Sequence, residues 1–490
     1  MGRMICKLFR IAERQGWRPE RPTRRDMLKA AAAAMVAAAM PMRSPAIALA
    51  QNARPRRVAI VGAGFAGLAC AETLVAAGVD VTVFEAESRP GGRVLTDRKL
   101  INGATVELGG EFVGSNHPTW ITLAEKHNLE LTELPDVEGE EAYILGGKLI
   151  KGNQLKNLYD DIQSLLDKAI EMAKEIDPIR PYTAPNAAEL DGQSFLEFVD
   201  QSKISDDAKV MLIADEESDN GVPAGRMSLL AYLSMIAGGG FADYFELSET
   251  HRCAGGNDAL ASAMATALGN RVQLRTPIKS IERAKSTVTI TTESGAVVEA
   301  DAVVLAIPPT AWDRITFDPP LNRRMKPQFG QNVKLIIKCD RPFWKDVEIA
   351  PDLYSDGLIQ IGWNSADAGQ DGVAYTLFNG ADKTAALREM PADERTRRAC
   401  KALAPAFPQL IDLVKKDLFM DWPGMPRVKG SYSFPAPGQV TRFGPTLVDG
   451  IDDGMAPLKF AGEHTSYAFI GYMEGALSSG VRVAQSLLGK

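Results

Sequence analysis

Three glycines and one acidic residue near the start of the chain have the types and the spacing that hold a phosphate-rich ligand. An apolar run at residues 58–61 leads into Gly62, Gly64 and Gly67, and a second apolar run ends in Glu85. This order predicts a strand, a glycine turn, a helix and a second strand, which is typical of dinucleotide binding. Gly62 permits the tight turn, Gly64 lets the backbone approach a pyrophosphate, and Gly67 lets the helix pack close to the sheet. We expect Glu85 to accept hydrogen bonds from the ribose hydroxyls of an adenosine.

A Gly-Gly-Arg segment at residues 91–93 follows the ribose acid and narrows the choice of dinucleotide. It resembles the pattern of FAD-dependent amine oxidoreductases, in which the arginine and the glycine backbone help to clamp the cofactor. The resemblance continues, in the same order, at residues 106–110, 255–260, 303–309, 460–465 and 471–476. Because these matches span nearly the whole chain after residue 58, the sequence resembles the flavin monoamine oxidase and L-amino acid oxidase superfamily. The resemblance implies FAD, and not NAD, as the dinucleotide.

The resemblance also implies which residues contact FAD. Glu463 reaches the ribityl chain, the backbone around Met473 faces the pyrimidine edge of the flavin, and the backbone of Val272 meets the adenine. A helix that starts at Met473 offers free N–H groups to the electron-rich edge of a reduced flavin. An ordinary core valine is the alternative for Val272. The cofactor-binding residues implied in this way are Gly62, Gly64, Phe65, Ala66, Gly67, Glu85, Gly92, Arg93, Gly109, Gly110, Val272, Glu463 and Met473.

Lys334 is the leading catalytic candidate, again by resemblance. It stands in a strand-like run, residues 332–338, that is similar to the family segment whose lysine holds a water against flavin N5. A positive donor at that place stabilises the reduced flavin and helps proton movement during reoxidation. The alternative is a solvated strand lysine, which is how we interpret Lys338 four residues further on.

An aromatic cage beside the flavin is the second catalytic feature that the resemblance implies. Tyr472 is expected to form one wall, which guides the nitrogen lone pair and excludes water. Tyr432 and Trp422 are both candidates for the opposite wall, and either could instead belong to the core. The segment around Tyr432, residues 430–434, has no cysteine, whereas the covalently flavinylated members of the family have one there. FAD is therefore expected to bind noncovalently.

The family resemblance implies a reaction in which the cofactor carries the difficult step. A hydride passes from the carbon that bears the amine nitrogen to flavin N5, the resulting imine is hydrolysed, and O2 reoxidises the flavin to give H2O2 and ammonia. The protein must orient the amine, keep it neutral and exclude water, and burial disfavours the ammonium form. Two alternatives stay open: an amine dehydrogenase that passes electrons to a periplasmic protein, and a flavin-binding protein without turnover.

Glu111 and Phe112 bear on the substrate, which is expected to be a primary amine or an L-amino acid. The L-amino acid oxidases of the venom type, which the chain resembles here, place a carboxylate-binding arginine near Phe112. The segment 108–113 has no arginine, which counts against such an oxidase unless the carboxylate binds from another position. Glu111 either steers a cationic amine or is a structural carboxylate bonded to the backbone.

The first 50 residues have the pattern of a twin-arginine export signal. Residues 23–29 contain paired arginines, an Ala/Met-rich run follows at 30–40, and residues 48–50 form an A-x-A cleavage site. The apolar run is a poor membrane span, since a span needs about 20 strongly apolar residues. An uncleaved signal anchor is the alternative. Because this route carries folded proteins, we expect a cofactor-loaded protein in the periplasm or outside the cell.

Charge and cysteine content limit the possible partners. The chain has a net charge of −7, and residues 1–50 contribute ten Lys/Arg and three Asp/Glu, so the mature chain carries −7 − 7 = −14. Such an acidic surface repels nucleic acid and attracts cationic amines. The four cysteines after residue 50 are widely spaced, so we expect small buried residues and no disulfide scaffold. No histidine cluster has metal-ligand spacing, and a homodimer stays open.

The cofactor motifs stand at the start, the middle and the end of the chain. We therefore expect a mixed α/β fold with a Rossmann-like FAD-binding domain assembled from residues 55–118, 248–320 and 425–490. A substrate domain is then inserted in two parts. The apolar spacing of residues 119–247 predicts helices, and β-rich runs in residues 321–424 predict a mixed sheet.

Overall fold

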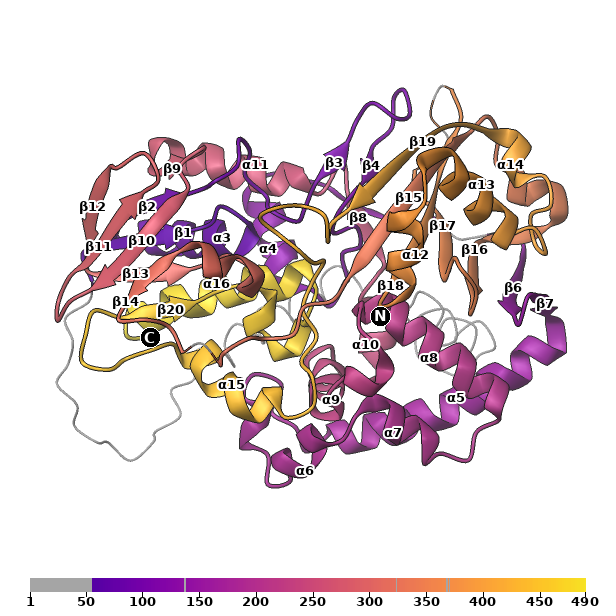
Figure 1. The fold of residues 1–490 in the computed structure, drawn as a ribbon, viewed down its shortest axis with the longest axis horizontal. Coiled ribbons are helices and arrows are strands. Elements are labelled where there is room, and N and C mark those ends of the chain that lie inside the picture. Colours follow the sequence, from indigo (N-terminus) through magenta and orange to yellow (C-terminus); the bar gives the residue numbers. More distant parts are fainter. Residues whose placement is uncertain (1–54, 136–137, 323, 367–368, 370) are drawn as a thin grey trace.

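The computed structural model describes residues 55–490, except 136–137, 323, 367–368 and 370. The predicted export signal, residues 1–50, lies outside the described residues. In Figure 1 the molecule has two halves, with sheets and flanking helices on the left and a large sheet above a layer of helices on the right. Segments from the start, the middle and the end of the chain meet in the left half.

A parallel sheet of five strands, in the order β20-β13-β1-β2-β9, forms the centre of the left half. Successive residues of a strand point to opposite faces, so in the first strand Val58 and Ile60 enter one core while Ala59 and Val61 enter another. The mixed α/β class is confirmed, and this sheet takes its strands from residues 57–84, 272–305 and 458–460. The strands are β1 (Arg57–Val61), β2 (Asp80–Phe84), β9 (Val272–Gln273), β13 (Ala302–Leu305) and β20 (Leu458–Phe460).

Three helices pack on one face of this sheet: α3 (Phe65–Ala76), α11 (Asp258–Leu268) and α16 (Met473–Leu487). A Cβ at Gly480 would lie 2.2 Å from the carbonyl oxygen of Ala66, so α16 crosses α3 at backbone distance. The last helix of the chain therefore lies against the helix that follows the glycine loop. A four-stranded sheet packs on the opposite face, with β10 (Ile278–Arg283), β11 (Val288–Thr292), β12 (Val297–Ala300) and β14 (Thr316–Asp318).

The right half contains a mixed sheet of seven strands, in the order β19-β15-β18-β17-β16-β6-β7. Neighbouring strands are antiparallel except β16 and β6, which are parallel. The hairpin β6–β7 belongs to residues 119–247, so this segment contributes strands as well as helices. The strands are β6 (Glu140–Leu145), β7 (Lys148–Lys151), β15 (Asn332–Cys339), β16 (Ile349–Ser355), β17 (Ile361–Asn364), β18 (Val373–Gly380) and β19 (Val414–Asp421).

The helices of residues 119–247 form most of the layer below this sheet in Figure 1. In the longest, α5 (Gly152–Ala173), the apolar positions Leu155, Leu158, Ile162 and Leu165 are buried. Their spacing of three or four residues places them on one face of the helix. The other helices in this part of the chain are α4 (Pro118–Lys126), α6 (Ala187–Gly192), α7 (Phe195–Asp200), α8 (Asp206–Asn220), α9 (Leu229–Gly238) and α10 (Ala242–Leu247).

Shorter elements complete the fold and join its halves. The strand pairs are β3 (Thr96–Asp97) with β4 (Val106–Glu107), and β5 (Leu131–Glu133) with β8 (His251–Cys253); the remaining helices are α12 (Lys383–Glu389), α13 (Ala392–Ala402), α14 (Leu410–Leu413) and α15 (Gln439–Asp449).

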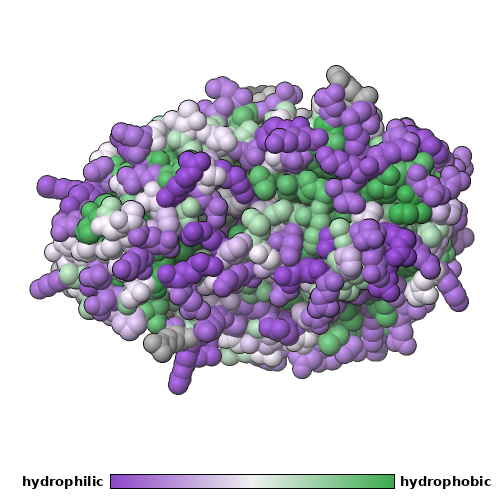
Figure 2. Space-filling model, turned by 45° about the horizontal axis from the view of Figure 1, so that its top comes forward, coloured by the Kyte–Doolittle hydropathy of each residue, from purple (hydrophilic) through white to green (hydrophobic). Residues whose placement is uncertain are grey.

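Cys70, Cys253, Cys339 and Cys400 are buried free thiols. Across the described ranges, no helix is long and apolar enough to cross a membrane. On the face in Figure 2, polar residues dominate, and apolar residues show between them mainly over the middle and right of the view.

Candidate active site

A cavity of about 400 Å³ collects the predicted site residues from both halves of the molecule. Its walls come from the glycine loop, from residues 91–94 and 109–112, from β15 and from residues 462–464 and 470–473. All the predicted cofactor residues line it except Gly67 and Val272, and so do Lys334, Tyr472, Glu111, Phe112, Trp422 and Tyr432. Their individual roles toward a cofactor or substrate remain predictions, but they share one cavity.

The glycine loop has the shape that a pyrophosphate needs. Gly62 has a φ of +108°, and a Cβ there would lie 2.6 Å from the carbonyl oxygen of Ala306. A Cβ at Gly67 would lie 1.9 Å from the carbonyl oxygen of Gly62, whereas a Cβ at Gly64 would meet no atom within 4 Å. The loop is thus closed on the protein side and open at Gly64. Helix α3 begins at Phe65 without a side-chain cap, so its first N–H groups are available to an anion.

Glu85 stands at the end of β2 with its carboxylate oriented by the backbone. Its two oxygens accept hydrogen bonds from the N–H groups of Ala63 and Glu87, each at 2.8 Å. Val272 pairs with Val83 on the edge of the same sheet but does not line the cavity. The adenine contact of Val272 therefore stays a prediction.

Arg93 and Glu463 form an ion pair that ties together segments far apart in the sequence. The Nη1 atom of Arg93 lies 2.7 Å from Oε1 of Glu463 and also donates to the carbonyl oxygen of Ser431 at 2.8 Å. The carboxylate further accepts hydrogen bonds from the N–H and hydroxyl of Ser433 and from the N–H of Gly471. Burial acts to raise the pKa of Glu463, but Arg93 and Ser433 outweigh it and hold the pKa below its ordinary value. Glu463 is thus an ionised organiser of the cavity wall.

Lys334 is buried at the cavity, unlike Lys338. Its ammonium donates to the carbonyl oxygens of Glu107 and Gly109, each at 3.0 Å, and to Oε2 of Glu111 at 2.8 Å. An ammonium has three N–H donors, so all three have acceptors within the protein. Lys338, on the same strand, pairs with Asp371 nearer the surface. The solvated-lysine alternative therefore does not fit Lys334. With all three donors on protein acceptors, the ammonium has none left in this structure for the water that the resemblance places against flavin N5.

Glu111 is held by three side chains, which differs from the expectation of bonds to the backbone. Oε1 accepts from Arg252 at 2.5 Å and from the indole N–H of Trp363 at 2.9 Å, and Oε2 accepts from Lys334. Burial acts to raise the pKa of Glu111, but Lys334 and Arg252 hold it below its ordinary value. Glu111 therefore organises the wall, with two hydrogen bonds to Oε1 and one to Oε2.

Arg252 was missed in the sequence, although it lies beside Phe112. Its guanidinium carbon is 5.2 Å from the centre of the Phe112 ring, which in turn packs on Trp363 with 5.9 Å between ring centroids. Strand β8 brings it there, through the bridge between Val113 and His251. The only sequence signal was its position just before the Gly255-Gly256 motif, so a search confined to residues 108–113 could not find it.

The two candidates for the second aromatic wall, Tyr432 and Trp422, both line the cavity but have different surroundings. Tyr472 is half-buried and packs on His117 and Tyr244, with ring centroids 5.4 Å and 6.4 Å away. Tyr432 lies next to it, because a Cβ at Gly471 would be 3.3 Å from the Tyr432 ring. Trp422 instead donates its indole N–H to the carbonyl oxygen of Leu108 at 2.8 Å and is 5% exposed. The geometry therefore favours Tyr432 as the wall and Trp422 as support for the loop.

Helix α16 opens onto the cavity at Met473. Tyr472 is its N-cap and makes no capping hydrogen bond through its side chain, so the first N–H groups of the helix are available. Gly110 lies against this residue, since a Cβ there would be 3.1 Å from the sulfur of Met473. This arrangement suits the electron-rich edge of a flavin, as the sequence predicted for the backbone around Met473.

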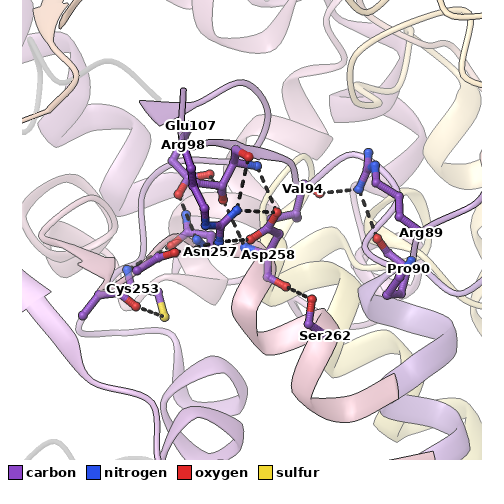
Figure 3. A network of polar contacts seen from close by, with 12 residues as sticks. Arg89, Pro90, Val94, Arg98, Glu107, Cys253, Asn257, Asp258 and Ser262 are labelled. Atoms are coloured by element: carbon purple, nitrogen blue, oxygen red, sulfur yellow. Dashed lines mark hydrogen bonds and ion pairs between the residues drawn. The ribbon is translucent and has the colours of Figure 1, made fainter. Parts of the chain in front are cut away.

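A buried polar network stands behind the loop at residues 107–111 and explains the Gly-Gly-Asn-Asp motif (Figure 3). The side-chain amide of Asn257 donates to the carbonyl oxygens of Gly110 and Glu111 at 3.0 and 2.7 Å, and its backbone N–H donates to Glu107 at 2.8 Å. Burial raises the pKa of Glu107 to about 7. Asp258 pairs with Arg98 and starts α11. The motif thus positions the cavity wall from outside.

Two acidic residues, Asp219 of the inserted segment and Glu249 just after it, also line the cavity, and no sequence pattern indicated them. Asp215, one turn before Asp219 on α8, has both carboxylate oxygens without a hydrogen-bond partner among the described residues. Burial, followed by repulsion from Asp219, raises the pKa of Asp215 well above its ordinary value. The apolar part of this wall includes Met235 and Phe378.

The parallel sheet, the open glycine loop and the two helix starts that face one cavity define an oxidoreductase that binds a flavin dinucleotide. None of the described cysteines lines the cavity, which agrees with noncovalent FAD. Residues 65–488 match the family described as flavin containing amine oxidoreductase, and the chain belongs to this family. It is an FAD-dependent enzyme that oxidatively deaminates amines.

Known relatives cover most of the chain. The flavin-containing amine oxidase B of Homo sapiens is 27% identical, over 88% of this chain and 86% of its own length. A probable flavin-containing monoamine oxidase A of Dictyostelium discoideum is 26% identical, over 88% of this chain and 97% of its own length. Among solved structures, putrescine oxidase bound to putrescine superposes with a TM-score of 0.81 at 27% identity, over 89% of this chain and 99% of that chain. Cyclohexylamine oxidase from Brevibacterium oxydans IH-35A, at 23% identity and a TM-score of 0.80, has the same fold.

Proposed function

We propose that this enzyme oxidises a primary amine that carries no α-carboxylate. The observation that carries the proposal is a pair of acidic side chains, Asp219 and Glu249, that line the cavity. Burial raises the pKa of Asp219 to about 7, so its negative charge develops above neutral pH. An anionic wall attracts an ammonium group and repels a carboxylate. The adjoining apolar side chains then favour the neutral amine, from which the hydride leaves.

The basic residues that line the cavity support this choice, because each already has a protein partner. Lys334 and Arg93 pair with Glu111 and Glu463. The other three are Arg89, bonded to backbone carbonyls, Arg314, bonded to the carbonyl oxygen of Pro426, and Arg427, paired with Glu87. A substrate carboxylate would have to compete with these partners.

An L-amino acid is the second candidate, and Arg252 is the observation in its favour. This arginine stands beside Phe112, the place at which the resembling amino acid oxidases have their carboxylate-binding arginine. Against it, Arg252 donates to Glu111 and to the carbonyl oxygen of Asn364 and does not line the cavity.

Anaerobic bleaching of the flavin by matched substrates separates the two candidates. Tyramine and tyrosine differ only in the α-carboxylate, so tyramine should bleach the flavin at much lower concentration. Preference for tyrosine would replace the first candidate by the second. Failure of a broad panel of amines and amino acids to bleach the flavin would contradict both and favour a flavin-binding protein without turnover.

We further propose that O2 accepts the electrons and that the enzyme acts in the periplasm after export through the twin-arginine machinery. Two observations support this: the relatives described above are oxidases, and residues 23–50 have the pattern of an export signal. Stopped-flow mixing of reduced enzyme with air-saturated buffer should show reoxidation within seconds. Reoxidation over minutes would point instead to a periplasmic protein acceptor. Fractionation of cells with and without the Arg24-Arg25 pair tests the export.

A further inference from the structure

Asn220 is a buried polar residue of the cavity that the residues discussed so far leave without a role. It is the last residue of α8, it lines the cavity next to Asp219, and it is 5% exposed. Its backbone carbonyl oxygen lies against Gly330, since a Cβ at Gly330 would be 2.7 Å from it. The N–H of Gly330 donates to the carbonyl oxygen of Tyr432, also at 2.7 Å. Asn220 therefore stands close to the candidate wall of the aromatic cage.

The side-chain amide of Asn220 is held in one orientation. Its nitrogen donates to the backbone carbonyl oxygen of Glu216 at 3.0 Å and to Oε2 of Glu216 at 2.8 Å. A carbonyl oxygen only accepts, so a flipped amide would place two acceptors against each other. Glu216 is fixed in turn, because the hydroxyl of Tyr232 donates to its other oxygen at 3.0 Å. The amide nitrogen of Asn220 thus faces the protein interior.

The amide oxygen of Asn220 is left for a ligand. No hydrogen bond reaches Oδ1 from the described residues, and, unlike the oxygens of Asp215, this atom is not enclosed by protein. Since the residue lines the cavity and is otherwise buried, Oδ1 faces the cavity. Buried polar groups in folded proteins almost always have a partner. This acceptor therefore lacks a donor that a bound molecule can supply.

The surroundings of this oxygen favour a donor that carries positive charge. Asp219 and Glu249 line the same cavity. Burial, followed by these two carboxylates, raises the pKa of Tyr432 above its ordinary value, which places both of them near the cage. Burial raises the pKa of Asp219 to about 7, and a neighbouring ammonium group favours its ionised form. A hydroxyl group gains only the hydrogen bond, whereas an ammonium group gains the hydrogen bond and the charge interaction.

We propose that Asn220 is a specificity-determining residue whose amide oxygen accepts a hydrogen bond from a second ammonium group of the substrate, so that the preferred substrate is a diamine. This inference rests on the proposed oxidation of amines without an α-carboxylate, and it specifies the other end of the molecule. The reacting amine lies at the cage of Tyr472 and Tyr432, and the second ammonium group lies at Asn220 beside Asp219. An ammonium group has three N–H donors, so it can bond to the amide oxygen and to a carboxylate together.

Anaerobic flavin reduction by matched substrates tests the ligand side of the proposal at pH 8. Diamines of increasing chain length are each compared with the alkylamine in which a methyl group replaces one amino group, and with the amino alcohol in which a hydroxyl group replaces it. Stopped-flow absorbance gives an apparent dissociation constant for each compound. In the wild type, at least one diamine should bind about tenfold more tightly than its alkylamine, and more tightly than its amino alcohol.

Asn220→Leu tests the residue. Leucine has nearly the shape of asparagine without the amide, so the ratio of the alkylamine and diamine dissociation constants should fall from about ten to about one. Both compounds are measured on one preparation, so a partial loss of folded enzyme cancels in the ratio. Tyr232→Phe is the matched control, because it removes a bond to Glu216 behind the amide and Tyr232 does not line the cavity. This control should keep the wild-type ratio. If Asn220→Leu does not fold, Asn220→Ala supplies the same comparison.

Four results would overturn the proposal: a wild type that binds diamines and alkylamines equally at every length, tighter binding of the amino alcohols, a wild-type ratio in Asn220→Leu, or an equal loss in Tyr232→Phe. Each of them leaves the proposed function standing, because the alkylamines still bleach the flavin. Bleaching by amino acids alone, or by no compound, would overturn the proposed function and this inference together.

Discussion

Lys334 and Glu111 form a buried ion pair across the cavity wall, with 2.8 Å between Nζ and Oε2, and Arg252 shares the same carboxylate at 2.5 Å. The three groups together carry one net positive charge. Strand β15 and the loop after β4 are thereby fixed to each other next to Gly109 and Gly110. The consequence is that the candidate catalytic lysine also holds the geometry of the predicted flavin wall.

Lys334→Met tests the catalytic part of this arrangement. The variant should still bind FAD, because Glu111 keeps its bonds to Arg252 and Trp363. Flavin reduction or reoxidation should slow by at least about tenfold, since the positive charge beside the predicted flavin wall is lost. Rapid-mixing absorbance of the two half-reactions measures this. Lys338→Met is the matched control on the same strand, and unchanged kinetics in Lys334→Met would remove this lysine from the mechanism.

Asp219→Asn and Glu249→Gln test the anionic wall. At about pH 8, above the pKa of about 7 to which burial raises Asp219, each should raise KM for a cationic amine by about tenfold, or about 1.4 kcal/mol, with a smaller change in kcat. Steady-state kinetics at low and high salt measure this, and the difference from the wild type should shrink with salt. Glu217→Gln is the control, since Glu217 is on the same helix, accepts from the N–H of Ala224 and does not line the cavity. Equal KM in all variants would refute the role of the wall.

The raised pKa of Glu107 leads us to expect that the stability of the protein depends on pH. Its pKa is about 7 when folded and 4.5 by ordinary value, so between these values the folded protein holds a proton that the unfolded chain has released. This proton therefore contributes its full share to the free energy of unfolding below pH 4.5. The share is lost as the pH rises through about 7, and it amounts to at most about 3 kcal/mol. Glu107→Gln removes this dependence. Urea unfolding at pH 5 and pH 8 should show a smaller drop for the variant than for the wild type, and parallel curves would contradict the assignment.

Alanine substitutions at two neighbouring positions of the glycine loop should have different effects, one on stability and the other on FAD binding. Gly67→Ala forces a Cβ to 1.9 Å from a carbonyl oxygen, so it should destabilise the protein by about 2–4 kcal/mol. Gly64→Ala meets nothing within 4 Å in the protein, so it should keep the fold and lower FAD content, because its methyl group enters the cavity. Thermal unfolding and the flavin-to-protein absorbance ratio measure the two effects. Gly192→Ala, also in open space but outside the cavity, should change neither.

The two aromatic candidates should respond differently. Tyr432→Leu should lower kcat/KM by about tenfold while FAD stays bound, since the predicted cage loses a wall. Trp422→Phe should lose about 1 kcal/mol of stability with the hydrogen bond to Leu108, and turnover should change little. Kinetics with a single good amine and urea unfolding give both values. A larger kinetic effect from Trp422→Phe would reverse the assignment.

Local sequence determined what could be predicted here. Gly62, Gly64 and Gly67 act within one turn, so their spacing alone indicated the strand, loop and helix of the fold. The apolar positions of α5 likewise report a single helix face. Arg252 and Asp219 were missed because their places beside the cavity depend on how β8 and α8 pack, which no nearby residue encodes. The choice between Tyr432 and Trp422 also needed structure, since the indole N–H bond to Leu108 is a contact across more than 300 positions.

The sequence did not indicate the hairpin β6–β7 either, because its pairing partner is distant in the chain. It is short, it stands in a segment otherwise rich in helices, and its strand partner β16 comes some 200 residues later. Pairing over such a separation leaves little trace in the local pattern, because the strand is stabilised by its neighbour and not by its own propensity.

The final strand and helix, β20 and α16, complete the sheet and the cavity that begin with β1 and α3. A ribosome must therefore translate past residue 473 before the walls around the flavin can close. Chains that stop before residue 473 lack the helix start at Met473 and the neighbouring Tyr472. We expect such fragments to be colourless, so that the yellow of a bound flavin reports that synthesis has reached the last helix.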